Sequence, residues 1–144
     1  MISMFEENEN FVYLKFGKRM LYRSMREYLE HNGKWMIYDT KEKVSKMASV
    51  MNKMVGRDGI MQIKLSKNPL PEVADDSGHG NKHVLMVYCD ERDNEGVKEV
   101  LKRELEVGRI DWKLDKDSLL EARERGVEIS KAFLDGLREM GEIE

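Results

Sequence analysis

The segment KWMIYDTKEKVSKMASVMNKMVG, residues 34–56, decides the fold of this chain. Its first six residues are largely aromatic or β-branched and apolar on both faces, which predicts a short buried strand. Thr40 is a suitable N-cap for a helix that follows. Gly56 is a suitable C-terminal stop. Between them lies an apolar stripe at the i, i+3, i+4 spacing of a helix that packs on a core: Val44, Met47, Ala48, Met51, Met54 and Val55.

The rest of the chain shows the same two periodicities. Apolar residues that alternate, or that occupy both faces of a short run, predict strands at 10–16, 60–67, 82–90 and 109–115. Apolar residues at helical spacing predict helices at 18–31, at 94–107 and in one or two further segments broken near Gly126. Gly33 is expected to end the first of these helices.

These elements predict a single α+β domain of 144 residues. Over residues 34–115 the predicted order is strand, helix, strand, strand, helix, strand, with more helices at both ends of the chain. The two middle strands are expected to pair antiparallel across a long flexible loop at 68–81, and residues 1–14 are expected to be loosely ordered. Such a chain covers one face of a curved, mainly antiparallel sheet with helices and leaves the other face open.

Composition and charge exclude several classes of protein. No apolar run reaches the length of a transmembrane helix, so no membrane association is expected. The single cysteine, Cys89, cannot form an internal disulfide, which favours a cytoplasmic location. Residues 15–67 carry 13 Lys and Arg against 5 Asp and Glu, whereas residues 68–144 carry 12 against 20. This asymmetry indicates either a basic surface for phosphate or nucleic acid, or two blocks that neutralise each other after folding.

The stretch DDSGHGNKHVLMVYCDERD, residues 75–93, contains two histidines four residues apart. His79 and His83 have the spacing of metal ligands on a helix, but the neighbouring glycines and the strand that follows argue against a helix here. We therefore expect no metal and no cofactor. No P-loop or dinucleotide-binding motif occurs, and the predicted strands lack the exposed aromatic residues of RNA-recognition modules except for Tyr88. Nucleic-acid binding is accordingly not favoured.

The strand alternation predicts a different candidate site. If Ile63 packs under the helices, Lys64 lies on the opposite face of the sheet, and Lys113 follows in the same way from Trp112. His83 joins these lysines if its side chain points to the same face. Ammonium groups on rigid strands suit a phosphate or a carboxylate. The alternative is that these lysines are ordinary solvated residues of an exposed sheet face.

Four short motifs, GKWMIYD, IKLS, HVLMVYCDERD and DWKLD, together resemble the basophilic-leukaemia-expressed protein family. The domain of that family is similar to the fold of the cap-binding translation initiation factor 4E. The resemblance implies a curved antiparallel sheet with helices on its convex face. Cap binding itself is not expected, because Trp35 and Trp112 are predicted to pack in the core. The positions that match the family's polar motif residues imply ligand contacts at Lys34, Lys64, Ser66, His83 and Lys113.

Three functions follow from these observations. The preferred one is binding of a phosphorylated or other anionic ligand, a small molecule or a peptide, on the open sheet face. The second comes from relatives of the resembling family that are labelled as similar to phosphothreonine lyases. That chemistry needs a lysine base, a histidine acid and further cations, for which Lys64, His83 and Lys113 are the catalytic candidates. The third is a non-catalytic interaction domain that binds a partner or forms a homodimer.

Overall fold

The computed structural model describes residues 4–7, 11–15, 22–66 and 83–144, with backbone alone for the first two ranges. The predicted loop at 68–81, which contains His79, lies outside the described residues.

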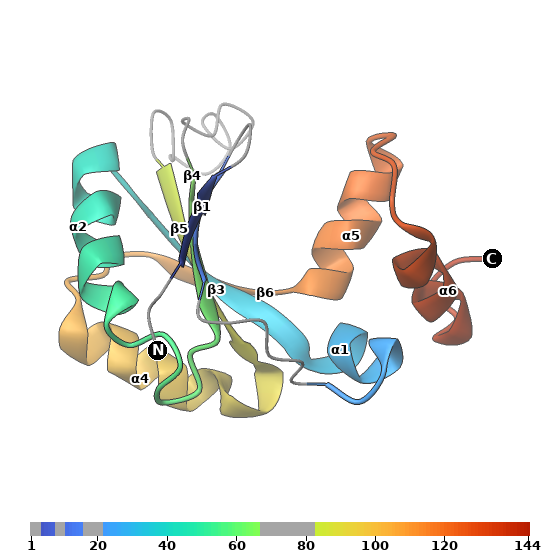
Figure 1. Cartoon of the computed structure of the whole chain (residues 1–144), viewed down its shortest axis with the longest axis horizontal. Coiled ribbons are helices and arrows are strands. Elements are labelled where there is room, and N and C mark those ends of the chain that lie inside the picture. Colours follow the sequence, from blue (N-terminus) through green and yellow to red (C-terminus); the bar gives the residue numbers. More distant parts are fainter. Residues whose placement is uncertain (1–3, 8–10, 16–21, 67–82) are drawn as a thin grey trace.

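A six-stranded antiparallel sheet forms the centre of the molecule (Figure 1). Its strand order is β1-β2-β4-β5-β3-β6. The strands are β1 (Met4–Glu7), β2 (Phe11–Lys15), β3 (Asn32–Asp39), β4 (Gln62–Ser66), β5 (His83–Asp90) and β6 (Ile110–Leu114). The mixed α+β single domain and the antiparallel pairing of β4 with β5 are as predicted. β1 and β2 extend the sheet beyond β4.

Helices lie on both sides of this sheet (Figure 1). They are α1 (Met25–His31), α2 (Lys41–Asn52), α4 (Asn94–Glu104), α5 (Asp115–Glu124) and α6 (Lys131–Glu139), with a short 3-10 helix η1 (Glu91–Asp93) before α4. The prediction of helices on one face is therefore wrong. α2 and α4 cover one face, whereas α5 is held on the other face by a contact between Asp115 and Lys34. Among the described helices, none combines the length and apolar character needed to cross a lipid bilayer.

The main core lies between the sheet and the pair α2 and α4. Thr40 caps α2 as predicted, since its Oγ1 accepts a hydrogen bond from the backbone N–H of Lys43 at 3.3 Å. The apolar stripe of α2 packs on the sheet, and Cys89 is fully buried in the same core. The most deeply buried residues of this core include Ile37, Val44, Met51, Ile63, Leu85, Val87, Val97 and Leu101.

Two predicted features at the start of the fold differ from the structure. α1 begins at Met25 and not at residue 18, because Ser24 is its N-cap and accepts a hydrogen bond from Glu27 N at 3.1 Å. Gly33 does not end this helix, because it lies inside β3. A Cβ at Gly33 would lie 2.8 Å from Cη2 of Trp112 and 2.9 Å from the carbonyl oxygen of Lys113. This glycine is thus required by the close approach of β6.

The second face of the sheet, opposite α2 and α4, is not open at its centre. Val84, Met86 and Tyr88 of β5 are each less than a tenth exposed, and so is Lys34 of β3. Both faces of β5 are buried along almost its whole length. Any ligand of this face therefore has to reach the partly exposed side chains around the buried centre.

Candidate functional site

Three lysines from three strands occupy the second face of the sheet, which we call the lysine face: Lys34 of β3, Lys64 of β4 and Lys113 of β6. Lys34 lies directly opposite Tyr88 on β5 and opposite Lys113 on β6, and Lys64 lies opposite Met86. The ring of Tyr88 lies near two ammonium groups, with the Nζ of Lys34 at 5.5 Å and that of Lys64 at 5.6 Å from its centroid. Both distances are within the range of cation–π attraction.

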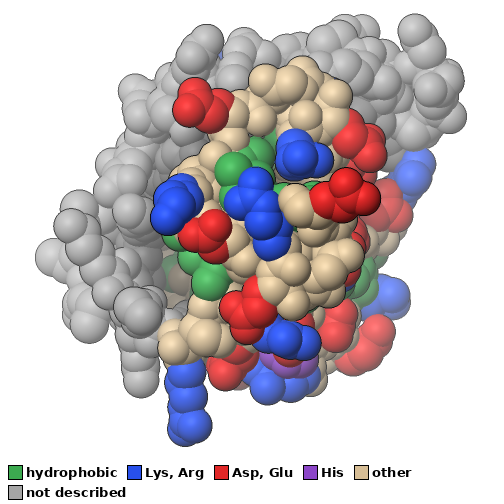
Figure 2. Space-filling view, turned by 90° about the vertical axis from the view of Figure 1, so that its right-hand side faces the viewer, with side chains coloured by type: hydrophobic (Ala, Val, Ile, Leu, Met, Phe, Trp, Pro, Cys, Tyr) green, Lys and Arg blue, Asp and Glu red, His purple; other side chains and the backbone are tan. Residues whose placement is uncertain are grey.

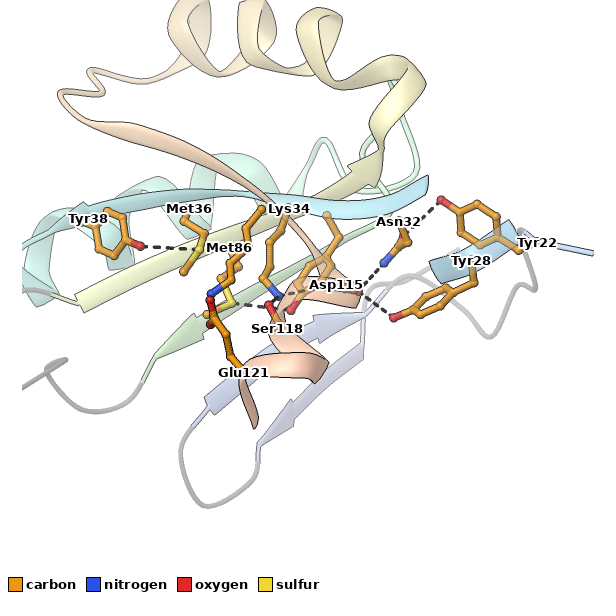
Figure 3. A network of polar contacts seen from close by, with 12 residues as sticks. Tyr22, Tyr28, Asn32, Lys34, Met36, Tyr38, Met86, Asp115, Ser118 and Glu121 are labelled. Carbon is orange, nitrogen blue, oxygen red and sulfur yellow. Dashed lines mark hydrogen bonds and ion pairs between the residues drawn. The ribbon is translucent and has the colours of Figure 1, made fainter. Parts of the chain in front are cut away.

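Asp115 joins this face to two helices (Figure 3). Its carboxylate accepts hydrogen bonds from Tyr28 Oη at 2.7 Å, from Asn32 Nδ2 at 2.6 Å and from Lys34 Nζ at 2.9 Å. Lys34 also donates to the hydroxyl of Ser118 at 2.7 Å. Asn32, Lys34 and Asp115 are all buried. A buried charge is tolerated when it is paired and fully hydrogen-bonded, so Lys34 has its partners inside the protein.

Lys113 also has an acidic partner on α5, because it forms an ion pair with Glu121. Two lysines directly opposite each other on neighbouring strands repel. The pairing of Lys34 with Asp115 and of Lys113 with Glu121 offsets that repulsion. α5 thus supplies two carboxylates to a face that carries three lysines.

The charge asymmetry of the sequence does not separate into single-sign surfaces on the side of α5 and α6. Figure 2 views the molecule from this side and shows acidic and basic side chains interspersed around a small hydrophobic area. Of the two interpretations of the charge blocks, mutual neutralisation describes this side.

Lys64 is the third lysine of this face, and it is partly buried. Burial lowers the pKa of its ammonium group below the usual value, because desolvation disfavours the charged form, while the charge of Asp115 acts in the opposite direction. A partly desolvated ammonium group is stabilised by a nearby anion. Lys64 is therefore the residue of the lysine face best placed to gain from an added negative charge.

The structure does not bring His83 to the lysine face. His83 lies opposite Asp39 at the end of β3 and shares the α2 side of the sheet with Leu85. It is 5% exposed, and its Nδ1 lies 3.4 Å from the carbonyl oxygen of Ser66. Ser66 is buried too, and its hydroxyl oxygen accepts a hydrogen bond from Val84 N at 2.9 Å. Of the five residues predicted to contact a ligand, the three lysines lie together on the lysine face. The other two, His83 and Ser66, hold β4 and β5 together.

Sequence reasoning missed Asp115 and its partners. The strand predicted at 109–115 includes Asp115, whereas β6 ends at Leu114 and Asp115 opens α5. The sequence DKDSLLEAR contains a signal for this helix, because acidic residues such as Asp115 are typical of a first helical turn. Its partners Tyr28, Asn32 and Lys34 lie more than 80 residues earlier, and no local pattern predicts such a contact.

In the part of the chain that the structure describes, no group of three or more His, Cys, Asp or Glu side chains is arranged to hold a metal ion. Comparisons with protein-family models, curated proteins and solved structures find no match to this chain.

A second polar cluster at the end of β5 predicts a pH dependence of stability. The Asp90 carboxylate accepts hydrogen bonds from Arg92 Nε and Nη2, both at 2.8 Å, and from Tyr22 Oη at 3.0 Å. The hydrogen bond from the Arg92 side chain is the main cause that lowers the pKa of Asp90 to about 2. A carboxyl with a lowered pKa stabilises the fold above its unfolded pKa of about 4, and this contribution is lost as the pH falls toward 2.

The test is urea unfolding of the wild type and of Asp90→Asn from about pH 5 to about pH 2. The difference in unfolding free energy between the two proteins should be largest at the upper end and shrink over this window. A difference that stays constant with pH would contradict the assignment to Asp90.

Proposed function

We propose that this protein binds a phosphorylated or other anionic ligand at the lysine face, with Lys64 as the main contact. The observation that carries the proposal is the environment of Lys64, whose partly buried ammonium group lies 5.6 Å from the centroid of the Tyr88 ring and has a lowered pKa. Phosphate and carboxylate groups form strong, charge-assisted hydrogen bonds to such a group. Lys113 lies on the same face but is paired with Glu121 of α5, so we propose Lys64 alone as the contact that binds the anion.

Lys34 has a different role in this proposal. It is buried and already bonded to Asp115 and Ser118, so it positions α5 beside the ligand and does not contact the ligand itself. His83 and Ser66 form contacts that hold β4 and β5 together, and we do not propose them as ligand contacts.

The resemblance to the basophilic-leukaemia-expressed family, and with it a fold similar to initiation factor 4E, belongs to the same proposal. Its support is the set of sequence motifs that contain Lys34, Lys64 and Lys113. A cytoplasmic location also belongs here, on the ground of the single buried Cys89.

A lyase reaction is the second function to consider at this face. The lowered pKa of Lys64 favours it, because a lysine acts as a general base only in its neutral form. The burial of His83 on the other side of the sheet counts against it, because the predicted acid is then separated from the predicted base. Ligand binding without catalysis is therefore the function that the geometry supports best.

The test compares thermal unfolding of the wild type, Lys64→Gln and Lys102→Gln in the presence of added anions. The probes are inorganic phosphate, a mononucleotide, a cap analogue, a short RNA and a phosphothreonine peptide. A bound probe at ~100 times its dissociation constant should stabilise the wild type by about 2.7 kcal/mol, which is a shift of several degrees. Lys102 is exposed on α4, on the other side of the sheet, and is the matched control.

We expect Lys64→Gln to lose the shift and Lys102→Gln to keep it. If no probe shifts the wild type, or if the shift survives in Lys64→Gln, the proposal is wrong. Loss of phosphoric acid from the phosphothreonine peptide, followed by mass spectrometry, would move the lyase reaction to first place.

A further inference from the structure

Among the described strands, β6 lies at one edge of the sheet. It pairs with β3 alone, and within the described part of the chain its backbone forms no hydrogen bond to any other element. All five of its residues are partly exposed. The unpaired N–H and C=O groups of an edge strand form a ready template for one more strand.

A groove of about 510 Å³ lies between this edge and α5. Trp112, Lys113 and Leu114 of β6 form one wall, and residues of α5, among them Leu120 and Glu121, form the other. The groove thus combines the free strand edge with apolar surface from both elements.

The charge of the groove is negative. Its acidic residues are Glu91, Asp117, Glu121 and Glu124, and its one basic residue is Lys113, which is paired with Glu121. The other three carboxylates are exposed, and none forms an ion pair with another described residue. Such a groove attracts a positively charged segment and repels nucleic acid and phosphate.

We propose that this groove binds an extended, basic peptide segment of a partner protein, which pairs with β6 as a further strand of the sheet. Side chains of a strand alternate between the two faces. Lys113 and the carboxylates of α5 lie on one face, and Trp112 packs on the other, next to Trp35. The peptide that fits therefore alternates Lys or Arg with apolar residues. A second copy of this chain fits poorly, because two such grooves would bring their carboxylates together.

The probe is a fluorescein-labelled peptide Lys-Val-Lys-Val-Lys-Val-Lys, with Glu in place of Lys in the control peptide. Fluorescence anisotropy with the full chain measures its affinity. The double variant Asp117→Lys/Glu124→Lys changes exposed residues of the groove and should weaken binding about tenfold. The matched control, Glu99→Lys/Glu106→Lys, makes the same charge change in or just after α4 and should bind as the wild type does.

The backbone part of the proposal has its own test. Two further peptides carry N-methyl groups on alternate residues. In one series the methylated amides lie on the peptide edge that faces β6, and in the other series they lie on the opposite edge. Only the series that faces β6 should lose binding, by about tenfold or more, because only one peptide edge pairs with the sheet. Hydrogen exchange of the β6 amides should slow when the unmethylated peptide is bound.

Three results would overturn the proposal: no binding of the lysine peptide, equal binding of both N-methylated series, or equal binding by the groove variant and its control. A dimer that protects the β6 amides without peptide would also overturn it, since the edge would then serve a second copy. Lys64→Gln should leave peptide binding unchanged, so this proposal and the anion site stand or fall separately.

Discussion

Replacing Asp115 with alanine is expected to lower the free energy of unfolding by about 3–5 kcal/mol. The change removes the carboxylate that pairs with Lys34 at 2.9 Å, and Lys34 is only 6% exposed. Its ammonium group would remain buried without a counter-charge, and Tyr28 and Asn32 would lose their acceptor. Urea unfolding followed by circular dichroism measures the loss.

Two further variants show whether burial is the cause. Glu121→Ala removes the partner of Lys113, but that pair is partly exposed and its loss should cost about 0–1 kcal/mol. The double variant Lys34→Met/Asp115→Leu removes both buried charges and should recover most of the stability. If Asp115→Ala costs no more than Glu121→Ala, the buried network does not hold the fold as described.

The same network connects the two proposed sites. Lys34 and Ser118 fix the start of α5 on the sheet, and α5 supplies both the counter-charges of the lysine face and one wall of the groove along β6. A variant that loosens α5 is therefore expected to affect both anion binding and peptide binding, whereas Lys64→Gln affects the first alone.

The parts of the fold that depend on local pattern could be predicted from the sequence. Thr40 and the apolar stripe after it identify α2, because capping and helical periodicity are properties of a single segment. Alternation in β4 and β6 likewise places Lys64 and Lys113 on the face away from α2.

The side occupied by His83 could not be predicted in this way. β5 has apolar residues at nearly every position and is buried on both faces, so alternation does not distinguish them. The face is set by the register with β3, where His83 lies opposite Asp39. Asp115 was missed for a related reason, because its partners are distant in the sequence.

The sequence predicts a helix stop at Gly33, because a glycine after a helical pattern resembles one. Its role in the structure is to make room for β6, and replacing it should therefore cost stability. Gly33→Ala is expected to lower the free energy of unfolding by roughly 1–3 kcal/mol. The new methyl group would meet the Trp112 ring, with Cη2 at 2.8 Å, and the Lys113 carbonyl oxygen at 2.9 Å. A bulky ring and a paired backbone cannot both move aside without distorting β6.

Gly96→Ala is the matched control for this substitution. Gly96 lies inside α4, and a Cβ there meets no other atom within 4 Å. Because alanine favours a helix, this variant should gain about 0.5–1 kcal/mol. If Gly33→Ala lowers the free energy of unfolding and Gly96→Ala raises it, the loss at Gly33 comes from the packing of Trp112. A neutral Gly33→Ala would show that β6 moves away from β3 easily, and a strand held so loosely could not serve as the edge to which a peptide is added.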